Sequence, residues 1–294
     1  MGRVVRLACA VALSAVVALI PGCAGAGLPG VSGSSGDSPL SAASSTPTGS
    51  VAASITAQLA SYPTKSRAPV WGRAFRGVID GVKTPDKVVA LTFDDGPTDR
   101  THRIVDVLDS FGAHATFFWV GSHITTDATT YSVSHGEELA NHTWTHPDMN
   151  GATSQEASEQ LGWTSARIAQ LTGTTPTWFR SPYNRLYTLE RAQVRAHGLL
   201  YANYDITSLD WAAGSTAQSV VAEIEMGLHP GGIILMHDSP NHDPLPYLPA
   251  VLSLLKARGY SMVTLSDLAT MGSPEVYHLR RFHADLGQGQ DSGQ

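Results

Sequence analysis

Between residues 88 and 264 the chain alternates short apolar runs with longer amphipathic segments. A short apolar run predicts a buried strand, and apolar side chains that recur every three or four residues predict one face of a helix. We expect strands at residues 88–93, 115–120, 199–204, 232–236 and 260–264. We expect helices at residues 100–111, 154–171, 189–197, 217–228 and 246–258, the second of them capped by Ser154. This alternation predicts an α/β fold, in which helices cover a parallel sheet that is either open or closed into a barrel.

Acidic and histidine side chains come directly after several of the expected strands. Asp94 and Asp95 follow the first strand, Asp210 follows the third and His237 follows the fourth. The carboxyl ends of parallel strands meet at one rim of a sheet, and parallel α/β folds build their active sites there. The sequence therefore places the chemistry of this chain at that rim.

The first 22 residues have the composition of an export signal. Arg3 and Arg6 precede an apolar run over residues 7–20, and Pro21-Gly22-Cys23 follows. A cationic start, an apolar core and a small residue at the cut are typical of a signal peptide. The apolar run is shorter than the stretch of about 20 residues that spans a bilayer. We therefore expect residues 1–22 to be removed on export.

Cys23 would be the single cysteine of the exported chain, because the other cysteine, Cys9, lies within the signal. A lone cysteine cannot form an internal disulfide. Residues 19–23 resemble a bacterial lipoprotein signal, in which the cysteine becomes the lipidated first residue. We expect an extracellular protein that a lipid on Cys23 anchors to the outer face of the cell membrane. The alternative is free secretion after an ordinary cut near residues 24–26.

Composition divides the rest of the chain into a tether, one domain and a tail. Residues 23–69 are rich in Ser, Gly, Ala and Thr, which bury too little apolar surface to fold and predict a flexible tether. Residues 70–272 are long enough for one domain with its own core, and residues 273–294 form a polar tail. The formal net charge of −6 becomes −8 without the two arginines of the signal, so nucleic acid is not an expected partner. We see no signal for oligomers and expect a monomer.

An aspartate pair and two histidines form a candidate metal site. Aspartates are common in turns, and Gly96-Pro97 completes a turn here, but one carboxylate can also bind a metal while its neighbour acts as a base. His142 and His146 are four residues apart, a spacing that puts two imidazoles on one side of a helical turn. Among 12 histidines such a pair also arises by chance. Two histidines and one carboxylate are nevertheless a common catalytic ligand set.

Arg180 and His237 are further candidates. Arg180 lies in an apolar and aromatic stretch, where it can pair with a surface acid or hold a catalytic carboxylate in place. His237 ends an apolar run, and a lone histidine there is more often structural than catalytic. Either Asp205 or Asp210 would be needed to orient and charge it. The domain has no Gly-x-Ser-x-Gly turn, so a serine hydrolase is not favoured.

Five motifs occur in a fixed order, at residues 92–97 (TFDDGP), 142–146 (HTWTH), 180–183 (RSPY), 205–211 (DITSLDW) and 235–237 (LMH). In this order and spacing they resemble the NodB-homology polysaccharide deacetylases of carbohydrate esterase family 4, over essentially the whole domain. The resemblance implies a distorted (β/α) barrel of seven or eight strands. It also implies a metal-dependent hydrolase that acts on acetylated sugar polymers.

The resemblance assigns a role to each motif residue. Asp95, His142 and His146 would hold a divalent metal, usually zinc. Asp94 would be the general base that deprotonates the nucleophilic water. Arg180 would steady Asp94.

The acid and the substrate contacts are implied in the same way. His237 would protonate the departing amine, and Asp210 would hold His237 in its charged form. The backbone N–H of Tyr183 would stabilise the oxyanion. Trp211 and Leu235 would line the small pocket for the acetyl methyl group.

Three functional hypotheses follow. The first is an N-deacetylase of peptidoglycan N-acetylglucosamine or N-acetylmuramic acid, which the motifs, the tether and the lipid signal favour. The second is a chitooligosaccharide deacetylase or an acetylxylan esterase of the same family, although no carbohydrate-binding module is attached. The third is a non-catalytic sugar-binding module, against which the presence of base, ligands and acid argues. Asn184 stands where the family usually has glycine, and we expect it to affect substrate choice more than catalysis.

Overall fold

The structure is a computed structural model, and it describes residues 71, 75, 77–185 and 187–276. The strands are β1 (Val78–Lys83), β2 (Val88–Asp94), β3 (Ala115–Trp119), β4 (Glu138–Asn141), β5 (Trp178–Phe179), β6 (Leu200–Ala202), β7 (Ile206–Thr207), β8 (Ile233–His237), β9 (Ser261–Val263) and β10 (Ser273–Val276). The helices are α2 (Thr101–Phe111), α3 (Thr126–Ser134), α4 (Ser154–Thr172), α5 (Thr188–Ala196), α6 (Ala217–Gly227), α7 (Leu248–Ala257), α8 (Leu265–Thr270) and the short 3-10 helices η2 (Gly121–His123) and η3 (Pro182–Asn184). Their order confirms the expected α/β fold.

The strands form one sheet in the order β10-β1-β6-β5-β4-β3-β2-β8-β7, with β9 paired to the start of β2. The β1–β10 pair is antiparallel, and the other strand pairs run parallel. The curled sheet meets itself where Gly81 of β1 forms a bridge with Gly232, directly before β8. There the N–H of Val82 donates to the carbonyl oxygen of Gly231 at 2.8 Å. This closure of a parallel sheet gives the distorted barrel that the family resemblance implies.

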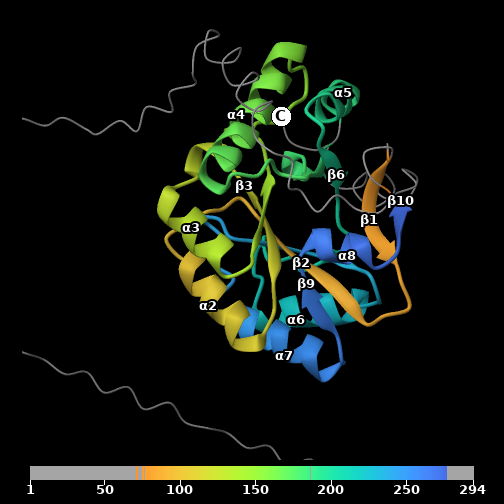
Figure 1. The fold of residues 1–294 in the computed structure, drawn as a ribbon. Coiled ribbons are helices and arrows are strands. Elements are labelled where there is room, and N and C mark those ends of the chain that lie inside the picture. Colours follow the sequence, from red (N-terminus) through yellow and green to blue (C-terminus); the bar gives the residue numbers. More distant parts are fainter. Residues whose placement is uncertain (1–70, 72–74, 76, 186, 277–294) are drawn as a thin grey trace, which may run out of the picture. The chain divides into compact units, whose positions relative to one another are not determined.

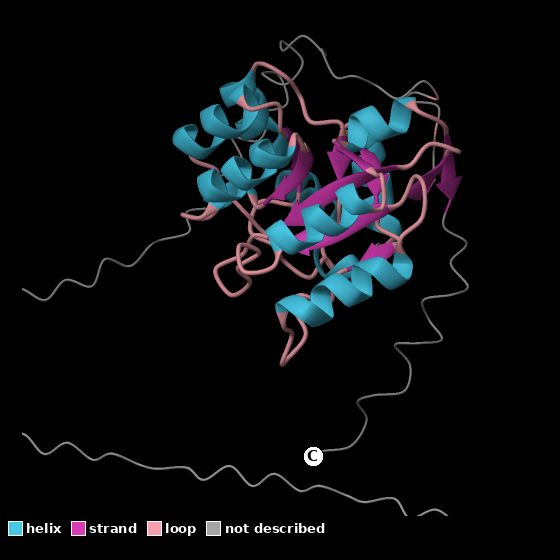
Figure 2. Cartoon of the chain, turned by 90° about the horizontal axis from the view of Figure 1, so that it is seen from below, coloured by secondary structure: helices cyan, strands magenta, loops and turns pink. Residues whose placement is uncertain are grey.

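Helices cover the outer face of the sheet. Figure 1 shows α2, α3 and α4 along one side of β2 and β3, and α6 and α7 along another. Neighbouring helices contact one another in the series α6, α7, α2, α3, α4 and α5. In Figure 2 several helices again flank the strands.

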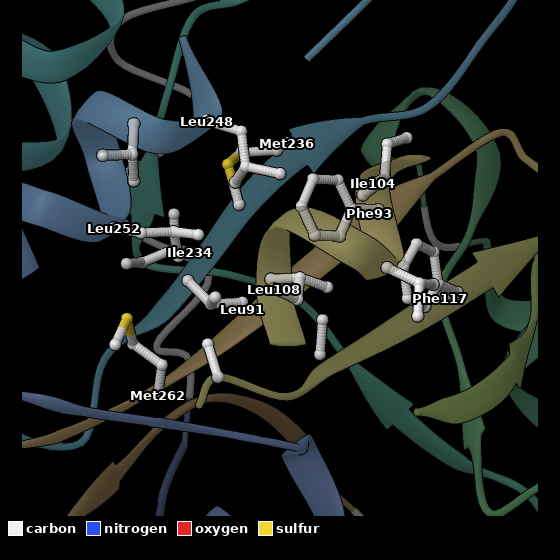
Figure 3. Close-up of a cluster of buried hydrophobic side chains, with 14 of the residues drawn as sticks. Leu91, Phe93, Ile104, Leu108, Phe117, Ile234, Met236, Leu248, Leu252 and Met262 are labelled. Atoms are coloured by element: carbon white, nitrogen blue, oxygen red, sulfur yellow. The ribbon is translucent and has the colours of Figure 1, made fainter. Parts of the chain in front are cut away.

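Strand β2 shows how the local sequence orients the side chain of Asp94. All seven of its residues are buried, and successive side chains of a strand point to opposite faces. Leu91 and Phe93 point outward and pack against α2 and α7, as Figure 3 shows. Ala90 packs in the separate inner cluster of apolar side chains. The same alternation therefore turns Asp94 towards the inside of the barrel.

The expected elements are present, with ends that differ by a few residues, and several short ones were not predicted. The unpredicted elements are β1, β4, β5, β7, β10, α3, α8, η2 and η3. The cap of α4 is Thr153 and not Ser154, because the Thr153 hydroxyl accepts from the N–H of Glu156. The sheet also extends past the expected domain end at residue 272, because β10 pairs with β1 up to Val276.

Several expectations lie outside the described residues. They are the signal over residues 1–22, lipidation of Cys23, the tether over residues 23–69 and most of the tail. Within the part of the chain that the structure describes, no helix combines the length and the apolar character that crossing a membrane requires.

Candidate active site

The expected base and acid lie side by side at one end of the sheet. Asp94 is the last residue of β2 and His237 is the last residue of β8. The two strands are parallel neighbours, and Asp94 and His237 are partners in the register. The strand ends therefore place both side chains at the rim where the sequence predicts the chemistry.

Asp95, His142 and His146 come together next to this pair. The Oδ1 atom of Asp95 lies 3.4 Å from Nε2 of His142 and 3.1 Å from Nε2 of His146. One ligand atom from each residue lies within 4.8 Å of the others. The Asp95 Oδ1 atom is buried and has no hydrogen-bond partner. A buried oxygen without a donor, facing two imidazole nitrogens, fits a divalent cation.

The backbone of this candidate metal site is not helical. Asp95, Thr143 and His146 have φ angles of 77°, 68° and 56°, in the left-handed region that non-glycine residues rarely adopt. The expected helical turn for His142 and His146 was wrong, because the two residues lie in the loop after β4. That loop is held by Asn141, whose side-chain oxygen accepts from the N–H of Thr143 at 2.9 Å.

The hydrogen bond of His142 fixes which of its nitrogens is free. Its Nδ1 lies 2.8 Å from the backbone oxygen of Arg180, which can only accept. Nδ1 therefore carries the proton, and the lone pair of Nε2 faces Asp95.

Asp95 is held as a carboxylate. Burial raises the pKa of its carboxyl, but the neighbouring imidazoles of His142 and His146 outweigh this effect, so the pKa lies well below its usual range. Burial lowers the pKa of His142, whereas Asp94 and Asp95 raise it, and the net shift is upward. Anionic oxygen and imidazole in one place are the donors that a divalent metal takes.

Arg180 holds one oxygen of Asp94. Its Nη1 donates to Oδ1 of Asp94 at 2.7 Å and to the Thr92 hydroxyl at 2.9 Å, and its Nη2 donates to the Asn203 carbonyl at 2.9 Å. Arg180 is 1% exposed and Asp94 is 4% exposed. The Arg180 guanidinium also lies over the ring of Phe118. Removing either charge would leave the other buried and unpaired.

His237 is held by Asp210 and not by Asp205. The Oδ1 of Asp210 lies 2.8 Å from Nδ1 of His237, and its Oδ2 accepts from the backbone N–H of His237 at 2.8 Å and from the Tyr247 hydroxyl at 2.5 Å. Asp205 instead pairs with His229 at 2.9 Å.

The electrostatics of this pair favour a charged imidazole. Burial lowers the pKa of His237, but the hydrogen bond and charge of Asp210 raise that pKa by more, so the net shift is upward. Burial raises the pKa of Asp210, yet His237 and Tyr247 bring it below its usual value.

The other predicted residues surround these groups. Tyr183 is 59% exposed, and its ring lies edge-on to His146, with ring centroids 4.8 Å apart. Trp211 is partly exposed and lies edge-on to His237, with centroids 5.1 Å apart. Leu235 is buried in β8, two residues before His237. Asn184 has a φ of 54°, which explains why a residue there must be glycine or one of the few that tolerate the left-handed region.

Two residues of the site were not predicted. Tyr247 donates to Asp210 from 37 positions away, and no sequence signal indicates it. Asp238 follows His237, and that adjacency could have drawn attention to it. Its buried carboxylate accepts from the hydroxyls of Thr98 at 2.5 Å and Thr101 at 2.7 Å, which ties the loop after Asp95 to the end of β8.

Comparisons with known proteins agree with this geometry. The sequence model of the polysaccharide deacetylase family matches residues 81–202. The chain is 31% identical over 195 residues to a bifunctional xylanase/deacetylase of Pseudobutyrivibrio xylanivorans. The match covers 63% of this chain and 31% of that protein. It is 32% identical over 185 residues to the peptidoglycan-N-acetylmuramic acid deacetylase PdaC of Bacillus subtilis. This match covers 62% of this chain and 38% of that protein.

The solved structures include a family 4 acetyl xylan esterase from Clostridium thermocellum in complex with a cobalt ion. It is 34% identical to this chain with a TM-score of 0.58, and the match covers 62% of this chain and 90% of that one. The chain spans only 31% to 38% of the two curated relatives, so their whole-protein activities are not carried over with the fold. The match to the family 4 acetyl xylan esterase, 34% identical and covering 90% of that chain, shows that this chain belongs to the polysaccharide deacetylases of carbohydrate esterase family 4.

Proposed function

We propose that this protein is a metal-dependent hydrolase that removes N-acetyl groups from an amino-sugar polymer. One observation carries the proposal: a carboxylate held by arginine, a two-histidine and aspartate cluster, and a histidine held by aspartate all meet at one rim. Amide hydrolysis needs a nucleophile, an oxyanion clamp and a proton for nitrogen. These three groups, with the N–H of Tyr183, are placed to meet those needs.

The metal would be held by Asp95, His142 and His146, and zinc fits a carboxylate with two imidazoles. When bound, a divalent cation supplies Lewis acidity at the acetyl oxygen and lowers the pKa of water to about 7. His142 is buried, whereas Asp95 and His146 are only partly buried, so one side of the cluster is open to substrate.

The remaining steps belong to the protein's own side chains. Oδ1 of Asp94 is held by Arg180, which leaves Oδ2 free to take a proton from the attacking water. The N–H of Tyr183 donates to the oxyanion, an interaction worth about 3 kcal/mol when well placed. The Nε2 of His237 gives its proton to the departing amine, because Nδ1 is already held by Asp210.

Peptidoglycan amino sugars are the substrate we favour. The similarity to PdaC, named as a peptidoglycan-N-acetylmuramic acid deacetylase, supports N-acetylglucosamine or N-acetylmuramic acid. Chitooligosaccharides or acetylated xylan are the alternative, since related proteins carry xylanase/deacetylase and acetyl xylan esterase names.

We also propose that the protein acts outside the cell, on a lipid anchor at Cys23. The support is the lipoprotein-like sequence of residues 19–23 at the end of the apolar run over residues 7–20. Cys23→Ser should release the protein from membranes into the medium. Unchanged membrane association of that variant would remove the lipid from the proposal.

Acetate release tests the activity directly. The chain is stripped of metal, then given zinc, and incubated with N-acetylated peptidoglycan, chitin oligosaccharides and acetylated xylan. We expect zinc-dependent release, fastest from peptidoglycan. Release from xylan alone would instead identify an esterase, and zinc binding without release from any of the three would identify a binding module.

A further inference from the structure

The loop that carries Tyr183 has an unfavourable backbone. The consecutive residues Tyr183 and Asn184 have φ angles of 56° and 54°, in the left-handed region that non-glycine residues rarely adopt. Such a conformation persists only where its surroundings impose it. Few contacts do so here, because Tyr183 is 59% exposed. Something beneath the loop must therefore hold it.

Ser181 closes this loop on itself. Its hydroxyl lies 2.5 Å from the carbonyl oxygen of Arg185, and the N–H of Asn184 donates to the Ser181 carbonyl at 3.2 Å. The N–H of Arg185 donates to the Pro182 carbonyl at 3.2 Å. These hydrogen bonds hold the two left-handed residues between fixed ends.

Glu190 of α5 lies under the loop. It is 1% exposed, and its Oε1 lies 2.7 Å from the Ser181 hydroxyl. Its Oε2 accepts from the N–H of Tyr187 at 3.3 Å. Glu190 therefore joins the start of α5 to the loop through Ser181.

A count of protons decides the state of Glu190. A serine hydroxyl has one hydrogen, and both of its neighbours here are oxygens at short distances. The Arg185 carbonyl can only accept, so the Ser181 hydrogen points to it. The contact to Glu190 then needs a hydrogen from the carboxyl, which must be protonated.

The surroundings of Glu190 agree with a neutral carboxyl. Burial is the largest influence and raises its pKa to about 7, Asp148 raises it as well, and the Tyr187 N–H lowers it. Tyr201 of β6 is buried close to Glu190 and stays neutral, since burial and Glu190 raise its pKa beyond the usual range. Arg180 and Arg191 act in the opposite direction and lower the pKa of Tyr201.

We propose that neutral Glu190 is a positioning residue for the Tyr183 loop, donating a hydrogen bond to Ser181 that holds the loop in its left-handed form. The part that concerns catalysis rests on the proposed function, through the Tyr183 N–H. The protonation of Glu190 does not. When Glu190 ionises, Ser181 faces two acceptors with one hydrogen, and the loop loses a support.

The pH dependence of stability tests the protonation. Glu190→Gln keeps the shape and donates permanently through its amide, so it imitates the neutral acid. A carboxyl whose pKa is raised by folding stabilises most at low pH and loses that contribution as pH rises through the folded value. The melting temperature of the native chain should therefore fall relative to Glu190→Gln as pH rises from about 5 to about 8. Parallel curves would overturn the protonation.

Glu223→Gln on α6 is the matched control, because it makes the same change away from the loop and the site. Its melting curve should run parallel to that of the native chain at every pH. A relative shift as large as that of Glu190→Gln would mean that the effect is not specific to the loop, which would also overturn the inference.

Turnover tests the positioning role. The ratio of kcat for Glu190→Gln to kcat for the native chain should rise by about threefold between pH 6 and pH 8.5, while His237 titrates alike in both. Ser181→Ala should lower kcat about tenfold at all pH values with little change in KM, because the loop loses its closure. A flat ratio would overturn the positioning role. If the native chain releases no acetate, the proposed function fails and the positioning role fails with it, while the melting curves still decide the protonation.

Discussion

The two oxygens of Asp94 have separate partners. Oδ1 is bound by Arg180 at 2.7 Å, and Oδ2 lies 3.8 Å from Nε2 of His142, towards the cluster of expected metal ligands. An asparagine in this position keeps the shape but cannot take a proton. Asp94→Asn should therefore lower kcat by about 10² to 10⁴, the usual contribution of a general base.

Bound zinc and acetate release are measured together on Asp94→Asn, because the ligands Asp95, His142 and His146 are unchanged. Asp109→Asn on the exposed face of α2 is the matched control and should behave as the native chain. Full turnover by Asp94→Asn would remove Asp94 from the role of base. Loss of zinc along with turnover would show instead that Asp94 supports the metal site.

Asp210 should set the alkaline limit of activity. It raises the pKa of His237, so the charged acid form is present below that raised pKa and is lost as pH rises through it. Asp210→Asn removes the negative charge and lets burial lower the pKa of His237. The alkaline limb of kcat/KM should move to lower pH, with a loss of about tenfold or more at pH 8. An unmoved limb would show that another group sets it.

Among individual residues, the sequence predicted those site side chains that lie within motifs. The residues alone left Asp205 and Asp210 open as partners of His237. The family resemblance favoured Asp210, and in the structure Asp210 contacts His237 while Asp205 is turned to His229. Tyr247 could not be found, since its contact with Asp210 depends on how α7 packs and not on spacing along the chain.

At the scale of elements, long segments with a clear period were predictable and short ones were not. The seven residues of β2 form a continuous apolar run, whereas β5 and β7 have two residues each, too few to show an alternation. The four-residue spacing of His142 and His146 is compatible with a helix and equally with a tight loop. Positive φ angles at Thr143 and His146 decide for the loop, and no sequence period reports them.

Gly231, directly before the Gly232 bridge, lies at the contact that closes β1 against the start of β8. Gly231 has a φ of 80°, and a Cβ there would lie 1.7 Å from the carbonyl oxygen of Val82. Gly231→Ala must push the backbones apart and break the hydrogen bond from Val82, so it should cost about 3 kcal/mol or more in free energy of unfolding.

Gly112 offers the comparison. Its φ is 64°, at the end of α2, and a Cβ would meet nothing within 4 Å. Gly112→Ala should cost only the strain of the backbone, about 1 kcal/mol. Urea unfolding of both variants measures the difference. Equal losses would mean that the contact at Gly231 relaxes freely and that the closure adds little.

At the scale of the whole molecule, the sequence predicted a parallel sheet with its chemistry at one rim, and the family resemblance supplied the closed barrel. Closure could not be derived from the sequence, because it depends on two glycines, Gly81 and Gly232, that meet from distant segments. The end of the domain was also set too early, because the polar residues of β10 show no apolar run and are recognised as a strand only by their pairing with β1.

Metal binding should report the folding of the whole domain. Asp95 follows β2, whereas His142 and His146 lie in the loop after β4, so only the folded chain brings the three ligands together. A ligand that binds only the folded state stabilises it by about 2.7 kcal/mol at 100 times its Kd. Zinc should therefore raise the melting temperature of the metal-free chain, and His142→Ala should remove most of that rise. Zinc that binds histidines of the unfolded chain reduces this stabilisation free energy. An equal rise in His142→Ala would show that zinc binds elsewhere, and the assignment of the three ligands would fall with it.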